Sequence, residues 1–187
     1  MSERGTLIGI YIAANKKEPM RERDQFRAIV GKGLEGDRYA NLTGTWTGVK
    51  GKREKEPIRH VSLIASEAIA LANIKSLASG GVEFLPQDTR RNLLTSGVDL
   101  NSLVGVRFLI GDVILEGVEL CKPCQIPSKY SGKQRFRESF EGIGGLRAEV
   151  FNSGVFQIGN RIDIFHRYID NSSNSNTVAS RPILAGL

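Results

Sequence analysis

The stretch GVRFLIGDVI, residues 105–114, is the clearest indicator of fold class in this chain. Two short runs of branched and aromatic residues flank Gly111-Asp112. Such a pair suits a two-residue hairpin turn, because glycine adopts positive φ freely and aspartate tolerates it. Residues 154–162, GVFQIGNRI, repeat the pattern around Gly159-Asn160. Both stretches therefore predict β-hairpins.

Further short β-type runs lie earlier in the chain, at residues 7–13, 60–64 and 91–95. One helix is expected to begin at Ser66, because the sequence SEAIALA combines good helix formers with an acidic first turn. Many short strands, regular turns and a single clear helix predict a β-barrel or β-sandwich core with a few short helices.

Length and composition indicate one globular domain. The chain has 187 residues, of which 40% are hydrophobic and 25% charged, and no apolar run is long enough to span a bilayer. Residues 170–180, DNSSNSNTVAS, are polar and low in complexity, so we expect a domain over residues 1–168 and a flexible tail over 169–187. Two cysteines make no disulfide framework, which favours a cytoplasmic protein.

A formal net charge of +6 favours an anionic partner. Nucleic acid and a phosphorylated cofactor both fit that charge. Nucleic acid is disfavoured, because the sequence contains neither a base-reading motif nor basic residues interleaved with aromatic ones.

The stretch GVELCKPCQIPSK, residues 117–129, holds the chain's only two cysteines, Cys121 and Cys124. A zinc site is disfavoured, because His60 and His166 are far apart and form no ligand pair. A redox dithiol has the right spacing, but it needs a helix directly after the motif, and Pro127 argues against one. Two ordinary buried thiols remain the simplest interpretation of the motif alone.

Taken together and in order, several motifs closely resemble the MOSC family, the domain found at the C-terminus of molybdenum cofactor sulfurases and as free-standing bacterial proteins. The resemblance spans about residues 5–165. The motifs that carry it are Gly36-Asp37-Arg38, residues 60–64 with Glu67, residues 90–100, residues 103–105, residues 108–112, Cys121-x-Pro123-Cys124, residues 144–148 and residues 158–160.

The resemblance implies a closed or partly open barrel similar to the pyruvate-kinase β-barrel domain, and binding of the molybdenum cofactor (molybdopterin). Pyridoxal phosphate binding is also attached to the family as a general term. Relatives of the mitochondrial amidoxime-reducing component reduce N-hydroxylated compounds. Their metal-coordinating cysteine matches Cys124, whereas Cys121 is not required by the family pattern.

Two functions follow from this resemblance. The first is an oxidoreductase that reduces a small N-hydroxylated substrate, with Cys124 as molybdenum ligand. Its electrons would come from an unidentified reductase, since the chain has no flavin, nicotinamide or iron–sulfur fingerprint. The alternative is a non-catalytic carrier of the cofactor or of sulfur.

Seven further residues are candidates for cofactor binding. Arg90 and Asn92 are preferred, because on a strand they would share one face and leave Arg91 on the other. Arg91 could equally form a surface ion pair. The remaining candidates are Ser62 and Ser66 near the strand-to-helix junction, where one serine could instead cap the helix, and Lys122 and Arg147, which could be ordinary exposed charges.

Asp37 and His60 could each have either a structural role or a role in proton transfer. Aspartate is common in glycine-rich turns, so Asp37 is expected to be a turn residue before a proton donor. His60 could relay a proton, but a single histidine on a strand is more often structural.

Overall fold

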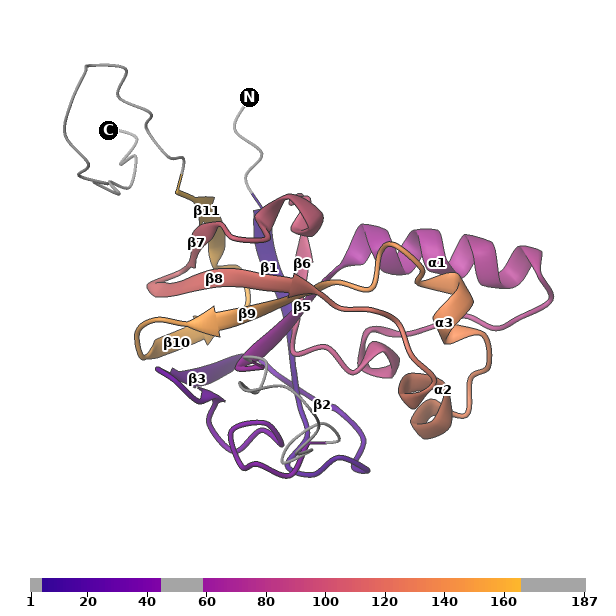
Figure 1. Ribbon diagram of the computed structural model, residues 1–187, viewed down its shortest axis with the longest axis horizontal. Coiled ribbons are helices and arrows are strands. Elements are labelled where there is room, and N and C mark those ends of the chain that lie inside the picture. Colours follow the sequence, from indigo (N-terminus) through magenta and orange to yellow (C-terminus); the bar gives the residue numbers. More distant parts are fainter. Residues whose placement is uncertain (1–4, 45–58, 166–187) are drawn as a thin grey trace, which may run out of the picture.

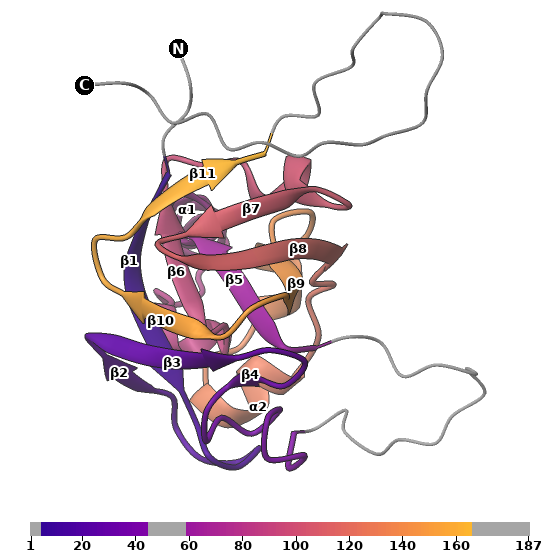
Figure 2. The ribbon, with the colours of Figure 1, turned by 90° about the vertical axis from the view of Figure 1, so that its left-hand side faces the viewer.

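The computed structural model describes residues 5–44 and 59–165, and seven of the described strands close into a barrel. The pairing runs β1-β11-β7-β8-β9-β5-β6 and returns to β1, with only β5 and β6 parallel (Figure 2). The strands are β1 (Gly5–Ile12), β5 (Val61–Ala65), β6 (Leu93–Ser96), β7 (Arg107–Ile110), β8 (Val113–Leu120), β9 (Leu146–Val150) and β11 (Arg161–Ile164).

Four further strands add to the barrel. β2 (Arg21–Arg23) pairs with the end of β1, and β10 (Gly154–Gln157), β3 (Gln25–Ile29) and β4 (Gly33–Leu34) form a small second sheet. The mainly β, closed-barrel fold is therefore confirmed.

Side chains alternate across the barrel wall, as the two-residue period of a strand requires. The interior is filled by branched and aromatic residues that are almost fully buried, among them Leu7, Ile10, Leu63, Leu93, Phe108, Leu115, Leu146 and Phe156. A filled interior leaves no lumen for a ligand. Polar residues of β5 and β9, such as Ser62 and Arg147, therefore face outward, and any binding site must lie on the outside of the wall.

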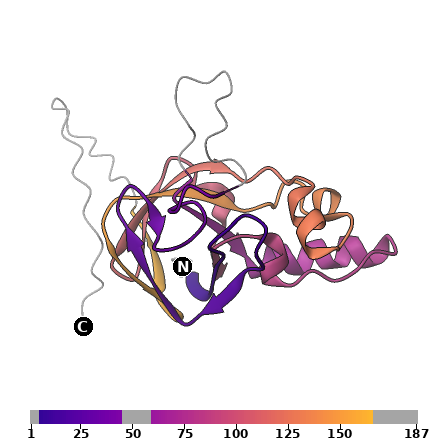
Figure 3. The ribbon, with the colours of Figure 1, turned by 90° about the horizontal axis from the view of Figure 1, so that it is seen from below.

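Four helical segments lie together beside the barrel, namely α1 (Ser66–Ala78), η1 (Pro86–Thr89), α2 (Ile126–Ser131) and α3 (Phe136–Ser139) (Figures 1 and 3). A fifth, η2 (Leu100–Leu103), packs on the barrel against β5, β8 and β9. Phe84, Phe136 and Phe140 form a second apolar cluster beneath α1, with ring centroids 4.3–5.6 Å apart. No helix in the described ranges is long and apolar enough to cross a membrane.

The two predicted hairpins have different outcomes. Gly111-Asp112 does join β7 to β8, with Ile110 opposite Val113 and φ of 63° at Gly111. The second prediction was wrong: β10 pairs with β3, whereas β11 pairs with β7 and β1. The turn at Gly159, with φ of 93°, carries the chain from one sheet to the other.

The region after the cysteines also differs from expectation. α2 begins at Ile126, with Pro127 in its first turn. The inference that Pro127 excludes a helix was wrong, because first-turn N–H groups have no partner within a helix and proline loses nothing there. His166 and the predicted tail, residues 169–187, lie outside the described residues, so the domain boundary at 168 stays a prediction.

Candidate functional site

A cleft rich in basic side chains lies against the outside of the barrel, where β5 and β6 begin and β8 ends. We call it the basic cleft. Of the predicted site residues it brings together all but Ser66. It is lined by Arg38, Tyr39, Arg59, Val61, Ser62, Arg90, Arg91, Asn92, Cys121, Lys122, Cys124, Ile126, Pro127 and Arg147.

Positive charge dominates this cleft. Six lysine or arginine side chains line it, and no described carboxylate does. Burial, together with the neighbouring Arg38, lowers the pKa of Arg90 to about 10, so Arg90 is still cationic at neutral pH. Burial and the nearby Arg147 likewise lower the pKa of Arg59. Cations that repel one another in a partly buried cleft are stabilised by a bound anion.

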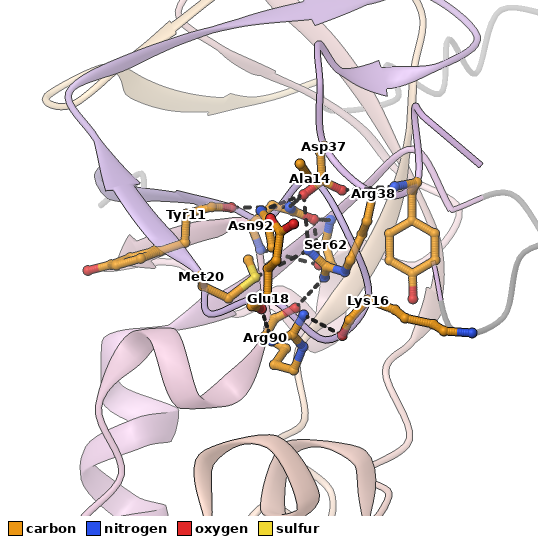
Figure 4. A network of polar contacts seen from close by, with 12 residues as sticks. Tyr11, Ala14, Lys16, Glu18, Met20, Asp37, Arg38, Ser62, Arg90 and Asn92 are labelled. Carbon is orange, nitrogen blue, oxygen red and sulfur yellow. Dashed lines mark hydrogen bonds and ion pairs between the residues drawn. The ribbon is translucent and has the colours of Figure 1, made fainter. Parts of the chain in front are cut away.

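Arg38, Arg90 and Asn92 form what we call the inner wall of the cleft (Figure 4). All four hydrogen-bonding positions of the Asn92 amide are used. Its Oδ1 accepts from the backbone N–H and the hydroxyl of Ser62, and its Nδ2 donates to the Tyr11 carbonyl and to Asp37 Oδ2. Asn92 therefore holds segments together with no spare group for a ligand.

Arg90 is held by the backbone around it. It follows η1 with φ of 59°, and its carbonyl accepts from Arg38 Nη2 at 2.9 Å. Its guanidinium donates to the carbonyls of Glu18 and Lys16 (Figure 4) and stacks over the Tyr130 ring, 4.9 Å from the ring centre.

The expected alternation of Arg90, Arg91 and Asn92 along a strand was wrong, because β6 begins only at Leu93. All three side chains reach the cleft because the left-handed turn at Arg90 replaces the strand there.

Asp37 lies behind the inner wall and is 1% exposed. Its carboxylate accepts from the N–H groups of Ala13 and Tyr39, from Arg38 Nη1 at 3.0 Å and from Asn92. A buried carboxylate with four donors is an anchor of the turn, in agreement with its interpretation as a turn residue. It compensates one of the two inner-wall arginines, which leaves one excess positive charge.

Lys122 and Cys124 form the opposite side of the cleft, which we call the rim. Cys124 is partly exposed, and Lys122 is exposed and makes no hydrogen bond or ion pair with the described residues. Cys121 also borders the cleft, but it is 3% exposed and its N–H donates to the Gly145 carbonyl. Cys124 is thus the thiol that a ligand can approach.

The two cysteines do not have the geometry of a redox dithiol. Residues 121–124 form neither a helix nor a turn, and α2 starts only at Ile126. A thiolate gains from a helix N-terminus only within the first turn. Cys124 precedes α2 by two residues and therefore lies outside that first turn, and both cysteines are free thiols.

Arg91 and Arg147 carry donors directed at the cleft beside the rim. Arg91 Nε donates to the Gly144 carbonyl at 2.9 Å, and Arg147 pairs with Glu119. The Gly144-Gly145 pair allows this close packing, since an added Cβ at Gly144 would lie 2.1 Å from the Cys121 carbonyl oxygen. The described contacts of Arg91 leave its Nη2 unused.

Ser62 and Ser66 are separated by the length of β5. Ser62 lies opposite Arg147 and borders the cleft, while Ser66 begins α1 and its hydroxyl donates to Glu67. The expectation that both serines lie at the strand-to-helix junction was wrong for Ser62. Neither serine caps α1, whose N-cap position is Ala65.

His60 has a structural contact, since its Nδ1 accepts from the Val150 N–H at 3.1 Å. Burial lowers the pKa of His60 below its ordinary value.

The sequence did not indicate three residues of the cleft or its supports, namely Arg38, Arg59 and Tyr130. Arg38 could have been found, because it belongs to the Gly36-Asp37-Arg38 motif.

The sequence was compared with models of known protein families. The MOSC domain profile matches residues 50–163. The chain belongs to the MOSC domain family. This family is associated with the molybdenum cofactor. No curated protein sequence matches the MOSC chain significantly.

Solved structures support the same fold. YuaD from Bacillus subtilis is 24% identical, with a TM-score of 0.69 over 85% of this chain and 94% of its own. YiiM from Escherichia coli is 15% identical, with a TM-score of 0.62 over 88% of this chain and 70% of its own. YiiM from Geobacillus stearothermophilus is 12% identical, with a TM-score of 0.60 over 89% and 77%. At these identities the likeness concerns the fold alone.

The residues of the basic cleft fit the molybdenum cofactor in kind. Molybdenum is soft enough to take a thiolate, and guanidinium and ammonium groups suit phosphate and carbonyl oxygens. The cleft volume of about 60 Å³ is well below that of a typical small-molecule pocket, so a cofactor would also extend across the open mouth. Within the described ranges no three His, Cys, Asp or Glu side chains gather, and Cys124 is the partly exposed thiol at the cleft.

Proposed function

We propose that this MOSC protein binds the molybdenum cofactor in the basic cleft, with Cys124 as metal ligand, and reduces N-hydroxylated compounds. The observation that carries the proposal is the partly exposed Cys124 thiol at the rim of a cleft that six cations line and no described carboxylate does. The family's association with this cofactor supports it.

The chain's own residues divide the work of binding. Lys122, Arg91 and Arg147 have donors available for the phosphate and the polar edge of the pterin. The inner wall keeps its charge fixed, because Arg38 and Arg90 are already held by backbone and carboxylate oxygens. Their field attracts the anion without a cost in side-chain ordering at binding.

When bound, the cofactor would supply a metal that changes oxidation state. Cys124 would hold that metal at the mouth of the cleft, where a small substrate can reach it. Lys122 beside it carries a proton donor at Nζ, which a reductive N–O cleavage requires. Electrons would come from a separate reductase, which is part of this proposal.

The test begins with cofactor content. The wild-type chain is produced in a host able to make the cofactor, and molybdenum is measured by mass spectrometry and pterin by fluorescence after oxidation. We expect close to one molybdenum per chain, a loss in Cys124→Ala and retention in the matched variant Cys121→Ala. Equal molybdenum content in the two variants would contradict ligation by Cys124.

Activity separates the two functions of this cleft. The loaded protein is assayed with a reductase and an amidoxime. Turnover that is lost in Cys124→Ala supports the enzyme. A loaded protein without turnover favours the alternative, a carrier of cofactor or sulfur, which the partly exposed Cys124 thiol would also permit.

A further inference from the structure

A second depression, distinct from the basic cleft, lies at the other end of β5. It is apolar, has a volume of about 520 Å³ and runs between α1, the turn after β6 and the segment before β9. We call it the apolar groove. Its apolar walls are formed by Ala65, Ala68, Leu71, Val98, Leu100 and Ile143.

The groove has an acidic rim. Glu67 and Asp99 are both exposed at its edge, and no lysine or arginine lines it in the described part of the chain. Leu71, which is 43% exposed, continues an apolar surface along α1 to Ile74, which is 67% exposed. An apolar channel of this size with a negative edge suits an apolar peptide that carries a positive charge.

The chain itself contains such a peptide. Residues 181–187 read RPILAGL, in which Ile183, Leu184 and Leu187 are apolar anchors and Arg181 precedes them. Proline 182 restricts the backbone toward an extended conformation and lowers the entropy lost on docking. Charge and apolar character therefore both complement the groove.

The segment can also reach the groove. Phe165, the last described residue, donates its N–H to the Arg107 carbonyl, just beyond η2, whose first residues line the groove. Ile162 pairs with Gly5, and a Cβ added at Gly5 would lie 2.8 Å from Val98 Cβ in the groove wall.

Sixteen polar-rich residues, 166–181, connect these points. As a coil they have a root-mean-square span of about 22 Å, and fully extended they reach about 50 Å. The connection is therefore long enough for residues 181–187 to reach the groove. It is also short enough to keep their effective concentration at the groove high.

From these observations we infer that residues 181–187 dock into the apolar groove of the same chain. An effective concentration on the order of 1 mM makes even a weak peptide interaction sufficient. Docking covers the exposed part of Leu71 and places Arg181 beside Glu67 and Asp99. Gly145 borders the groove and the neighbouring Gly144 carbonyl accepts from Arg91 of the basic cleft, so the docked segment lies next to a support of that cleft.

The test uses the full chain and methyl NMR spectra of Leu71, Val98, Leu100 and Ile143. Ile183→Asp with Leu184→Asp should shift these four methyl signals to those of an uncovered groove. The matched control, Asn174→Asp with Asn176→Asp, adds the same two charges to the polar connection and should leave the signals in place. Unchanged groove signals in the first variant would overturn the inference.

A reciprocal variant tests the groove side. Leu71→Asp should release the Ile183 and Leu184 methyl signals to random-coil positions, whereas Leu77→Asp, on α1 but outside the groove, should not. A groove signal that depends on protein concentration would mean that a second copy occupies the groove, and it would refute docking within one chain. Neither result depends on whether the cofactor is bound.

Discussion

The two sides of the basic cleft are built in opposite ways. The inner wall, Arg38, Arg90 and Asn92, is buried, and its polar groups are largely engaged by Asp37, Ser62 and backbone carbonyls. The rim, Lys122 and Cys124, is open and carries polar atoms without fixed partners in the described structure. The inner wall thus provides a permanent positive field, while the rim is free to bind.

This comparison predicts that the inner wall governs stability and that the rim governs ligand binding. Substitutions in the two regions should therefore separate the free energy of unfolding from molybdenum content.

Asp37→Ala should have the largest effect on stability. It removes the carboxylate that pairs with Arg38 and leaves Arg38 as an unpaired buried charge beside the buried Arg90. We expect a loss of about 3–5 kcal/mol in the free energy of unfolding, measured with urea. The control is Glu35→Ala, in an exposed pair with Arg27 at 3.9 Å, which should cost less than about 1 kcal/mol. Similar losses in both variants would mean that the network does not hold the wall.

Asn92→Ala comes next. It removes one buried donor from the Tyr11 carbonyl and one from Asp37, so a loss of about 2–3 kcal/mol is expected. Asn101→Ala is the matched control, because that amide also donates to a carbonyl, of Gly142, but at the exposed surface. Equal thermal midpoints of the two variants would contradict the structural role of Asn92.

Lowering the pH should reduce the stability of the fold through His60, which contacts Val150 on β9. Burial lowers the pKa of His60, so between that value and about 6.5 the unfolded chain binds a proton that the folded chain does not. Stability is therefore retained above about pH 6.5 and falls as the pH drops toward the folded pKa.

His60→Asn should reduce this pH dependence, because its Oδ1 can still accept from the Val150 N–H without titrating. Urea unfolding between pH 5 and 8 measures the difference. His166 is unchanged in both proteins, so a pH slope identical to wild type would exclude His60 as the cause.

Cys124→Ala and Lys122→Ala should have the smallest effect on folding. Lys122 is exposed, Cys124 is partly exposed, and neither side chain has a partner among the described residues. The free energy of unfolding should therefore stay within about 0.5 kcal/mol of wild type. Molybdenum content, by contrast, should be lost in Cys124→Ala. A large loss of stability without loss of metal would contradict the assignment of ligand binding to the rim and of stability to the inner wall.

Two turns with similar sequences show what a local sequence signal can predict about strand pairing and what it cannot. Gly111-Asp112 and Gly159-Asn160 have the same turn chemistry, and both do reverse the backbone at a glycine with positive φ. Only the first joins paired strands. The second failed as a hairpin because β10 finds its partner in β3, with Phe156 opposite Phe26, and that choice depends on residues distant in sequence.

The basic cleft shows the same difference between what local sequence signals predict and what distant contacts decide. The motifs around Arg90, Cys124 and Arg147 named most of its lining, because family-like spacing identifies residues without knowledge of their contacts. Ser66 lies outside the cleft although it was predicted to belong to it, and Arg38 was missed, because the lining of the cleft depends on which segments the fold brings together.

The sequence by itself determined the barrel class, the family and the cysteine that stands at the rim. Strand periodicity, turn residues and motif order are local properties, so they can be interpreted without neighbours in space. Only the tertiary structure decided that Asn92 is fully engaged and that Cys124 is open. Asn92 meets Asp37 across 55 residues of chain, and a hydrogen bond at that separation exists only once the barrel has closed.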